Sequence, residues 1–151
     1  MAGRRDSAYV DAWLALATTE TLVRRTLDRK LAEAGSAVTA VEFAVLCALD
    51  ETGQGLTMAV LGRHVGLSAA GCGRAVRRLE SHSFVRQDRT SSDRRLVRVA
   101  LRADGRVALN RARRVVIAYV ATLLDQPAAA TLVAALQPLR LAVEGSARAT
   151  E

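Results

Sequence analysis

Apolar positions repeat with a helical period near both ends of the chain. From residue 7 to residue 34, apolar side chains recur at steps of three, four and seven residues, which places them on one face of a long helix. Residues 103–124 show the same spacing, and Pro127 opens a further helix, since proline is tolerated in the first turn. These helices carry more apolar surface than one small domain can cover. The pattern therefore predicts packing against a second copy of the chain.

The segment between these helices begins with a capping signal. Thr39 is followed three residues later by Glu42, a pair that can satisfy two free backbone N–H groups at the start of a helix. Apolar residues then recur at helical spacing until Gly53 interrupts them. We expect a second helix here.

Two short helices joined by a glycine-containing turn follow. Thr57 can cap a helix that ends near Val65, Gly66 permits a tight turn, and Ser68 can cap a helix that runs to about Ser81. This order of elements is typical of a helix-turn-helix. The second of these helices would be the recognition helix of a DNA-binding protein.

The period then changes from helical to alternating. Residues 84–89 and 96–101 are strand-like, and the polar segment 90–95 between them is turn-prone and basic. A hairpin directly after a helix-turn-helix makes a winged helix. The sequence thus predicts a mainly α fold with a small β-hairpin wing.

The chain is expected to form a single domain over residues 1–151. In this prediction, residues 38–101 form the DNA-binding lobe, and residues 7–35 and 103–145 form dimerisation helices. The chain has no run of about 18 apolar residues and begins without the apolar core of a secretory signal. We therefore expect a cytoplasmic protein without a membrane span.

Charge favours a polyanionic partner. Lysine and arginine total 22 against 15 acidic residues, a net charge of +7, and Lys30 is the only lysine. Arginine suits bidentate contacts to phosphate and guanine, although a GC-rich genome would also favour arginine codons. Cys47 and Cys72 lie far apart without a C-x-x-C motif, so neither a metal site nor a cofactor is expected. No catalytic constellation is visible, which disfavours an enzyme.

Several motifs in order resemble the MarR family of bacterial regulators. The most specific is the wing, in which Asp93-Arg94-Arg95 runs into the strand 96–101 and then Gly105-Arg106. Upstream, the helix-turn-helix framework of the family matches Leu61, Gly66-Leu67-Ser68, Leu79-Glu80 and Phe84-Val85. The resemblance implies a homodimeric transcriptional regulator, commonly a repressor, that binds double-stranded DNA and is released by a small effector.

The sequence departs from the family pattern at three places. Arg102 stands where the family usually has threonine, which weakens the cap of the following helix. Ser83 occupies a position usually held by glycine. In the recognition helix, small residues replace the serine or threonine that often meets DNA in related proteins: Ala70, Gly71 and Gly73.

Arginines dominate the polar side of the predicted recognition helix. Arg74, Arg77 and Arg78 can pair with guanine or clamp phosphates, and Arg74, nearest the helix start, is the best candidate for reading a base. The alternative is a solvated face with ion pairs such as Arg77 to Glu80. The glycines indicate either close approach to DNA, a recognition helix poorly ordered when free, or positions where bulk is unwelcome.

Further DNA contacts are expected from the wing and the caps. Arg94 and Arg95 suit insertion into a narrow minor groove, and by resemblance Asp93 would orient the wing. An ordinary charged turn is the alternative. Phosphate-positioning groups would be Thr57, Ser68 and Arg89.

Effector sensing has two hypotheses. A thiol switch would use Cys72 or Cys47, although by resemblance Cys72 occupies an apolar core position. A pocket for a small aromatic or other organic ligand, as in the family, would use Tyr9, Trp13, Arg113 and Tyr119, which otherwise pack the dimer core. An architectural DNA-binding dimer without specific readout is the competing function.

Overall fold

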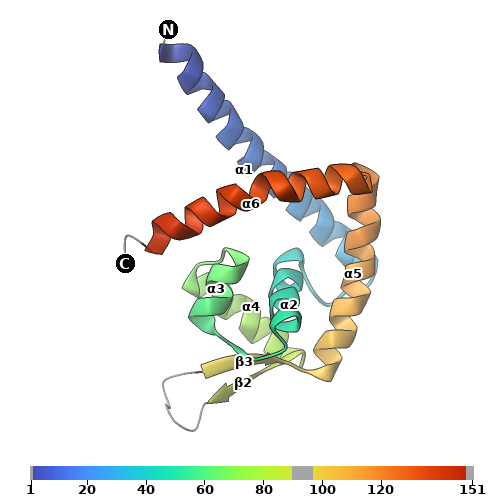
Figure 1. Ribbon diagram of the computed structural model, residues 1–151. Helices are drawn as coiled ribbons and strands as arrows, with labels where there is room; N and C mark the ends of the chain where they lie inside the picture. The colour runs from blue at the N-terminus through green and yellow to red at the C-terminus, as the bar shows by residue number, and fades with distance from the viewer. Residues whose placement is uncertain (1, 90–96, 149–151) are drawn as a thin grey trace.

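The computed structural model describes residues 2–89 and 97–148, with the side chains of 7–88 and 97–146. Its described part consists of helices and a small sheet, arranged as a winged lobe from which long helices extend (Figure 1). In chain order the elements are α1 (Ala2–Glu33), α2 (Ala40–Thr52), β1 (Leu56–Thr57), α3 (Met58–Val65), α4 (Ala69–Ser81), β2 (Val85–Arg89), β3 (Val97–Leu101), α5 (Ala103–Leu123) and α6 (Gln126–Arg148). The expected mainly α fold with a small β wing is confirmed.

The sheet has one strand more than the sequence predicted. Its order is β1-β3-β2, with both pairings antiparallel. β3 lies in the middle, where Val99 is opposite Leu56 of β1 on one side and Gln87 of β2 on the other. The two residues of β1 are too few to show an alternating pattern, so only the hairpin was predictable.

The local signals of the helix-turn-helix are confirmed. Thr39 and Glu42 form both halves of a capping box at the start of α2. Gly66 ends α3 with φ of 67°, a left-handed conformation that glycine adopts without steric cost, and Ser68 accepts a hydrogen bond from the Gly71 N–H to cap α4. The tight turn at Gly66 sets α4 across the end of α3.

A continuous core holds the lobe together. It joins α2, α3, α4 and the sheet to the lower half of α5 and the last turns of α1, through fully buried side chains that include Leu31, Leu46, Leu61, Val76, Leu79, Val99 and Leu109. Burying each such side chain contributes about 1.5–3 kcal/mol relative to leaving it in water. The recognition helix α4 is therefore mounted on a rigid body.

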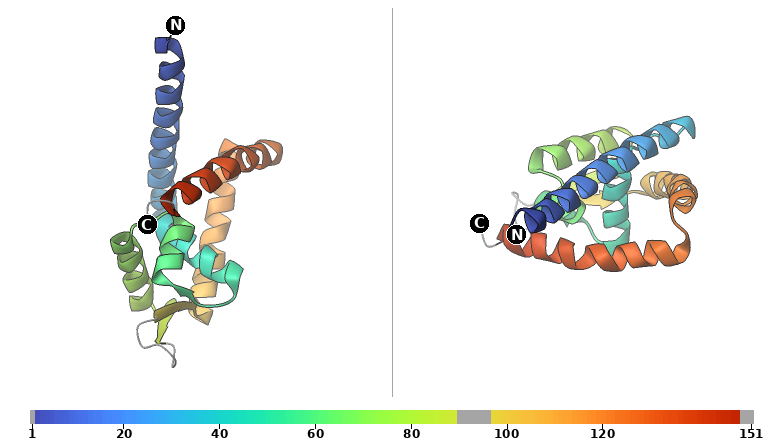
Figure 2. Two further views of the ribbon diagram at one scale, coloured as in Figure 1. Left: turned by 60° about the vertical axis from the view of Figure 1, so that its left-hand side comes forward. Right: turned by 90° about the horizontal axis from the view of Figure 1, so that it is seen from above.

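The outer helices extend beyond this core. α5 rises from the sheet, α6 turns back from its far end, and the N-terminal half of α1 projects away from the lobe (Figures 1 and 2). α1 begins at Ala2 rather than near residue 7, and α6 continues to Arg148 rather than ending near 145. Both helices therefore run past the predicted ends, and α6 continues through Gly145 without a break.

No single helix within the described residues is long and apolar enough to span a bilayer, and only α5 and α6 taken together, bent by 97°, reach that length and composition.

The two departures expected to weaken helix ends are visible. Arg102 caps α5 without a side-chain hydrogen bond. Ser83 has φ of 59°, which makes it the one described residue other than glycine with a positive φ. Its N–H bonds to the Glu80 carbonyl, and the Phe84 N–H bonds to the Leu79 carbonyl, a Schellman ending that favours glycine at this position.

Replacing Ser83 by glycine is therefore expected to stabilise the protein. The left-handed conformation costs a residue with a Cβ about 1–2 kcal/mol, part of which glycine loses again through the greater freedom of its unfolded chain. We expect Ser83→Gly to raise the free energy of unfolding by about 0.5–1 kcal/mol in urea denaturation. A lower midpoint for the variant would contradict this account of the turn.

Candidate nucleic-acid interface

The recognition helix α4 divides into an inner and an outer face. Cys72, Val76 and Leu79 are fully buried and fix the helix to the core. The outer face is exposed and consists of small or polar residues: Ala69, Ala70, Arg74, Arg77, Arg78, Glu80 and Ser81. A surface-mounted helix whose outer side lacks large apolar residues and carries arginines is suited to enter a groove of DNA.

The three arginines of α4 differ in their contacts. Arg78 forms an ion pair with Glu42, with 3.1 Å between Nε and Oε1. Arg74 and Arg77 have no hydrogen bond or ion pair within the described part of the chain. The alternative pairing of Arg77 with Glu80 does not form, because Glu80 accepts a hydrogen bond from the Gln87 amide at 2.7 Å instead. As far as the described residues go, Arg74 and Arg77 thus present unpaired charge to solvent.

The small residues of α4 are not equivalent. Ala70 is exposed, and Gly71 is half-buried beside the Ser68 hydroxyl that caps the helix. Gly73 is buried, and a Cβ there would meet the Met58 methyl at 3.8 Å and the Arg77 guanidinium at 3.5 Å. This burial disfavours direct DNA contact through Gly73, whereas Ala70 lies on the open surface.

Both predicted hydroxyl contacts serve as helix caps. Thr57 Oγ1 accepts a hydrogen bond from the Val60 N–H at 3.4 Å, and Ser68 Oγ accepts one from the Gly71 N–H at 3.1 Å. Each hydroxyl keeps its own proton for donation. The caps therefore leave both groups able to donate to a phosphate while they begin α3 and α4.

The wing is described only at its base. Arg89 pairs with Val97 in the β2–β3 register, and the guanidinium of Arg98 donates to the Gly55 carbonyl at 2.8 Å, which ties β3 to the start of β1. The predicted contacts at the tip lie outside the described residues: Asp93, Arg94 and Arg95.

Two acidic side chains that the sequence analysis did not assign to a site connect α2 to its neighbours. Glu42 reaches α4 through Arg78. Asp50 faces α5, where it lies 3.6 Å from Arg106 and 3.3 Å from Arg113. The capping-box pattern predicted a role for Glu42 at the start of α2, but no pattern in the sequence predicted its partner on α4 or the partners of Asp50 on α5.

The cysteines occupy different surroundings. Cys72 is fully buried in the core, as the resemblance implied, and burial raises the pKa of its thiol. Cys47 is half-buried on α2, where burial raises the pKa and the Arg113 guanidinium counters part of that rise. Raised thiol pKa values leave little of the reactive thiolate at neutral pH.

We expect both thiols to be slow nucleophiles in the folded protein. Because each pKa lies above its ordinary value of 9.0, the thiolate fraction at pH 7 stays below about 1% and rises roughly tenfold per pH unit up to that pKa. Iodoacetamide labelling of the Cys47→Ser and Cys72→Ser variants, followed by mass spectrometry, measures each remaining thiol alone. Cys72 is expected to be the slower; labelling of either faster than free cysteine at pH 7 would instead favour a thiol switch.

The four predicted ligand residues do not meet in one place. Tyr9 and Trp13 lie on the projecting half of α1, 78% and 66% exposed. Tyr119 is buried on α5 under the Lys30 ammonium, and Arg113 binds Asp50 and Asn110. Within one chain they form no pocket, because α1 carries its aromatic residues away from the lobe.

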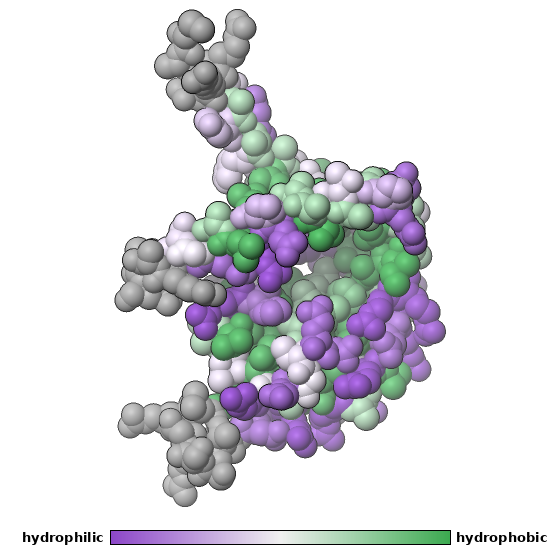
Figure 3. Space-filling view, viewed as in Figure 1, coloured by the Kyte–Doolittle hydropathy of each residue, from purple (hydrophilic) through white to green (hydrophobic). Residues whose placement is uncertain are grey.

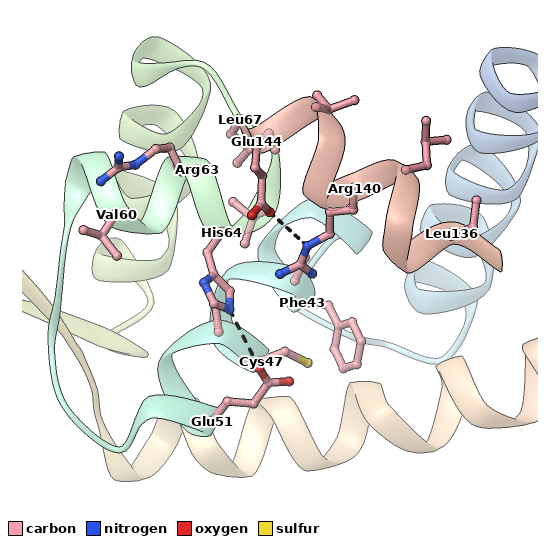
Figure 4. Close-up of a pocket in the computed structure, with 17 residues that line it drawn as sticks. Phe43, Cys47, Glu51, Val60, Arg63, His64, Leu67, Leu136, Arg140 and Glu144 are labelled. Atoms are coloured by element: carbon pink, nitrogen blue, oxygen red, sulfur yellow. Dashed lines mark hydrogen bonds and ion pairs between the residues drawn. The ribbon is translucent and has the colours of Figure 1, made fainter. Parts of the chain in front are cut away.

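A large hollow lies elsewhere, between α6 and the lobe. Its volume is about 1380 Å³, and α2, α3 and α6 provide its walls. Apolar side chains predominate, while Arg140 pairs with Glu144 on one wall and His64 lies 4.0 Å from Glu51 on the other (Figure 4). Figure 3 shows the apolar surface continuing from this hollow along α6 and α1. No sequence signal identified it, since its walls are distant in the chain.

Known structures share this architecture. BldR, a transcriptional regulator from Sulfolobus solfataricus, superposes with a TM-score of 0.79 at 23% identity, over 87% of this chain and 94% of its own. AbsC, a MarR family regulator from Streptomyces coelicolor, gives 0.72 at 24% identity, over 89% and 93%. CouR from Rhodococcus jostii RHA1, bound to p-coumaroyl-CoA, gives 0.72 at 20% identity, over 86% and 92%. CouR is also known bound to a 23-mer DNA duplex.

The sequence comparison agrees with the structural one. No curated protein sequence matches the chain significantly. The sequence model of the MarR family matches residues 38–96, which begin two residues before α2 and end at the residue before β3. The structural neighbours named above are described as transcriptional regulators or, for CouR, as a transcriptional repressor. Over residues 38–96 the chain is therefore similar to the MarR family, and its fold is that of solved transcriptional regulators of this kind.

Proposed function

We propose that the protein is a homodimeric repressor that binds a pseudo-palindromic operator and is released by a small organic effector. The observation that carries this proposal is the outer face of α4, where Arg74 and Arg77 stand exposed and unpaired within the described residues. In the proposed complex α4 enters the major groove and the β2–β3 hairpin reaches the adjacent minor groove. CouR, a similar fold, is described as a transcriptional repressor bound to DNA.

Dimerisation is proposed from the apolar surface of the outer helices. α1 exposes Tyr9, Trp13 and Leu22, and α6 exposes Val133 and Leu141, each by more than half of its side chain. Apolar surface on this scale is costly in a monomer and is covered most simply by the same surface of a second copy. The homodimer would then place two α4 helices about one DNA turn apart.

The proposed effector site is the hollow beside α6. Its walls join the lobe that carries α4 to one of the proposed dimerisation helices, so a ligand there would bias their relative position. The walls are mainly apolar, and Arg63 adds a positive charge beside the Arg140–Glu144 and His64–Glu51 pairs, which suits a largely apolar organic molecule with an acidic group. CouR binds p-coumaroyl-CoA, which shows that this fold accommodates an acyl ligand of that kind.

Selection from a pool of random-sequence duplexes tests the proposal. The purified protein is mixed with the pool, bound duplexes are amplified, and the enriched sequence is then titrated by fluorescence anisotropy at several salt concentrations. We expect an inverted repeat whose half-sites lie about one helical turn apart, and binding that weakens steeply with salt. Enrichment of no sequence would instead support an architectural, non-specific DNA-binding protein.

A further inference from the structure

Glu42 is the only charged side chain buried within the described residues, with 4% of it exposed. Burial of a carboxylate is costly unless each oxygen finds a partner. Glu42 lies on α2, behind the recognition helix, where it cannot touch DNA. Its burial therefore requires an explanation within the protein.

The two oxygens of Glu42 have different partners. Oε2 accepts a hydrogen bond from the Thr39 N–H at 2.8 Å and so completes the capping box of α2. Oε1 lies 3.1 Å from the Nε of Arg78 on α4. One carboxylate thus bridges the start of α2 to the recognition helix.

The same end of α2 is also attached to α1. The Ala40 N–H donates to Asp28 Oδ1 at 2.7 Å, across twelve residues of chain. A polar path therefore runs from Asp28 on α1, through the first turn of α2 and Glu42, to Arg78 on α4. It connects the helix proposed to carry the dimer contact with the helix proposed to read DNA.

The position of Arg78 on α4 makes this path relevant to DNA reading. Arg78 is one helical turn after Arg74 and directly follows Arg77, so it shares their side of the helix. The apolar contacts of Cys72, Val76 and Leu79 seat α4 on the core, but hydrophobic contacts have no direction. A charge-assisted hydrogen bond does have direction, and it resists rotation of α4 about its own axis.

We infer that Glu42 is a positioning residue for sequence recognition, which holds α4 through Arg78 in the orientation that presents Arg74 to the bases. The inference rests on the proposed function and adds a role for two residues that do not read DNA themselves. It reassigns Arg78 from the DNA contact expected from the sequence to an anchor of the helix.

The substitution Glu42→Gln tests the bridge with little change of volume. The two partners bind different oxygens of the carboxylate, and in glutamine one of these positions becomes an NH2 donor, which cannot accept from either the Thr39 N–H or Arg78. Glutamine is also tolerated in a capping box, which favours folding of the variant. Thermal unfolding and stoichiometric titration at high DNA concentration establish the folded, active fraction.

The readout is anisotropy titration of a duplex selected by the wild-type protein and of a scrambled duplex of the same composition. For Glu42→Gln we expect the Kd for the selected duplex to rise about tenfold, the cost of a misplaced base contact, while the Kd for the scrambled duplex changes less than about twofold. Arg78→Ala is expected to give the same pattern with an unchanged salt slope. A protein with both Glu42→Gln and Arg78→Ala should bind the selected duplex no more weakly than the weaker of the two single variants, because both substitutions remove the same Glu42–Arg78 interaction.

Asp50→Asn is the matched control. It makes the same carboxylate-to-amide change on the same helix, but Asp50 faces Arg106 and Arg113 of α5 instead of α4. We expect the ratio of the two Kd values to stay within about twofold of wild type. An equal loss of discrimination in Asp50→Asn would show a general loosening of α2 and overturn the inference.

Two further results would overturn it. One is Glu42→Gln with wild-type discrimination. The other is Arg78→Ala weakening both duplexes equally while the salt slope falls by about one, which marks a direct phosphate contact. If Glu42→Gln does not fold, Arg78→Ala and Arg78→Gln decide alone, because their substituted side chain is 57% exposed. A wild-type protein that selects no sequence would instead refute the proposed function.

Discussion

Gly105→Ala is expected to destabilise the protein by about 3 kcal/mol or more, at the upper end of overpacking substitutions. A Cβ at this position would overlap the Phe84 carbonyl, with its carbon only 2.8 Å away, and would lie 2.9 Å from a methyl of Leu101. The carbonyl cannot move aside, because it accepts the hydrogen bond of the Arg102 N–H at 2.9 Å. This close approach packs Phe84, which follows α4, against the first turn of α5.

Thermal and urea unfolding measure this effect. For a chain of this length, about 3 kcal/mol corresponds to a fall in Tm of roughly 6–12 °C. Gly145→Ala is the control, since a Cβ there meets nothing within 4 Å in α6 and alanine favours the helix by about 1 kcal/mol. A Gly105→Ala variant as stable as wild type would contradict the packing described for the α5 start.

Arg74→Ala is expected to lose discrimination at one base pair in each half-site of the operator. Arg74 lies in the first half of α4, exposed and without a partner among the described residues, where recognition helices contact base edges. A bidentate arginine–guanine pair contributes about 1–3 kcal/mol of discrimination per half-site, so a dimer would lose roughly 2–6 kcal/mol. The loss should concentrate at one base pair in each half-site.

Titration against duplexes that carry single base-pair changes measures this loss of discrimination. The wild-type protein should reject one particular change in each half-site, and Arg74→Ala should bind all changes at that position alike. Arg114→Ala removes the same charge from the second half of α5 and serves as control, with discrimination retained. If Arg74→Ala weakens every duplex equally, Arg74 contacts phosphate only.

The fold of the lobe could be predicted because its signals are local. The capping box at Thr39 and Glu42, the turn at Gly66 and the cap at Ser68 each act within a few residues, and the structure confirms all three. The strain at Ser83 was also visible as a departure from the family pattern. Burial of Cys72 was expected from the family resemblance, and the structure confirms it.

Long-range features could not be predicted in the same way. The partners of Glu42 and Asp50 lie on other helices, and ion pairs of this kind leave no periodic pattern. The two residues of β1 gain strand geometry only from pairing with β3. The aromatic residues of α1 were grouped with Tyr119 by resemblance to the ligand pockets of the family, but the projection of α1 separates them within one chain.

The ratio of affinities for the selected duplex and for its scrambled counterpart, measured at physiological salt, tests the central claim most directly. A specific regulator binds its site at least about a thousandfold more tightly than other DNA. We predict a ratio of that size for this protein, with Arg74→Ala reducing it. A ratio close to one would contradict a function in sequence-specific regulation.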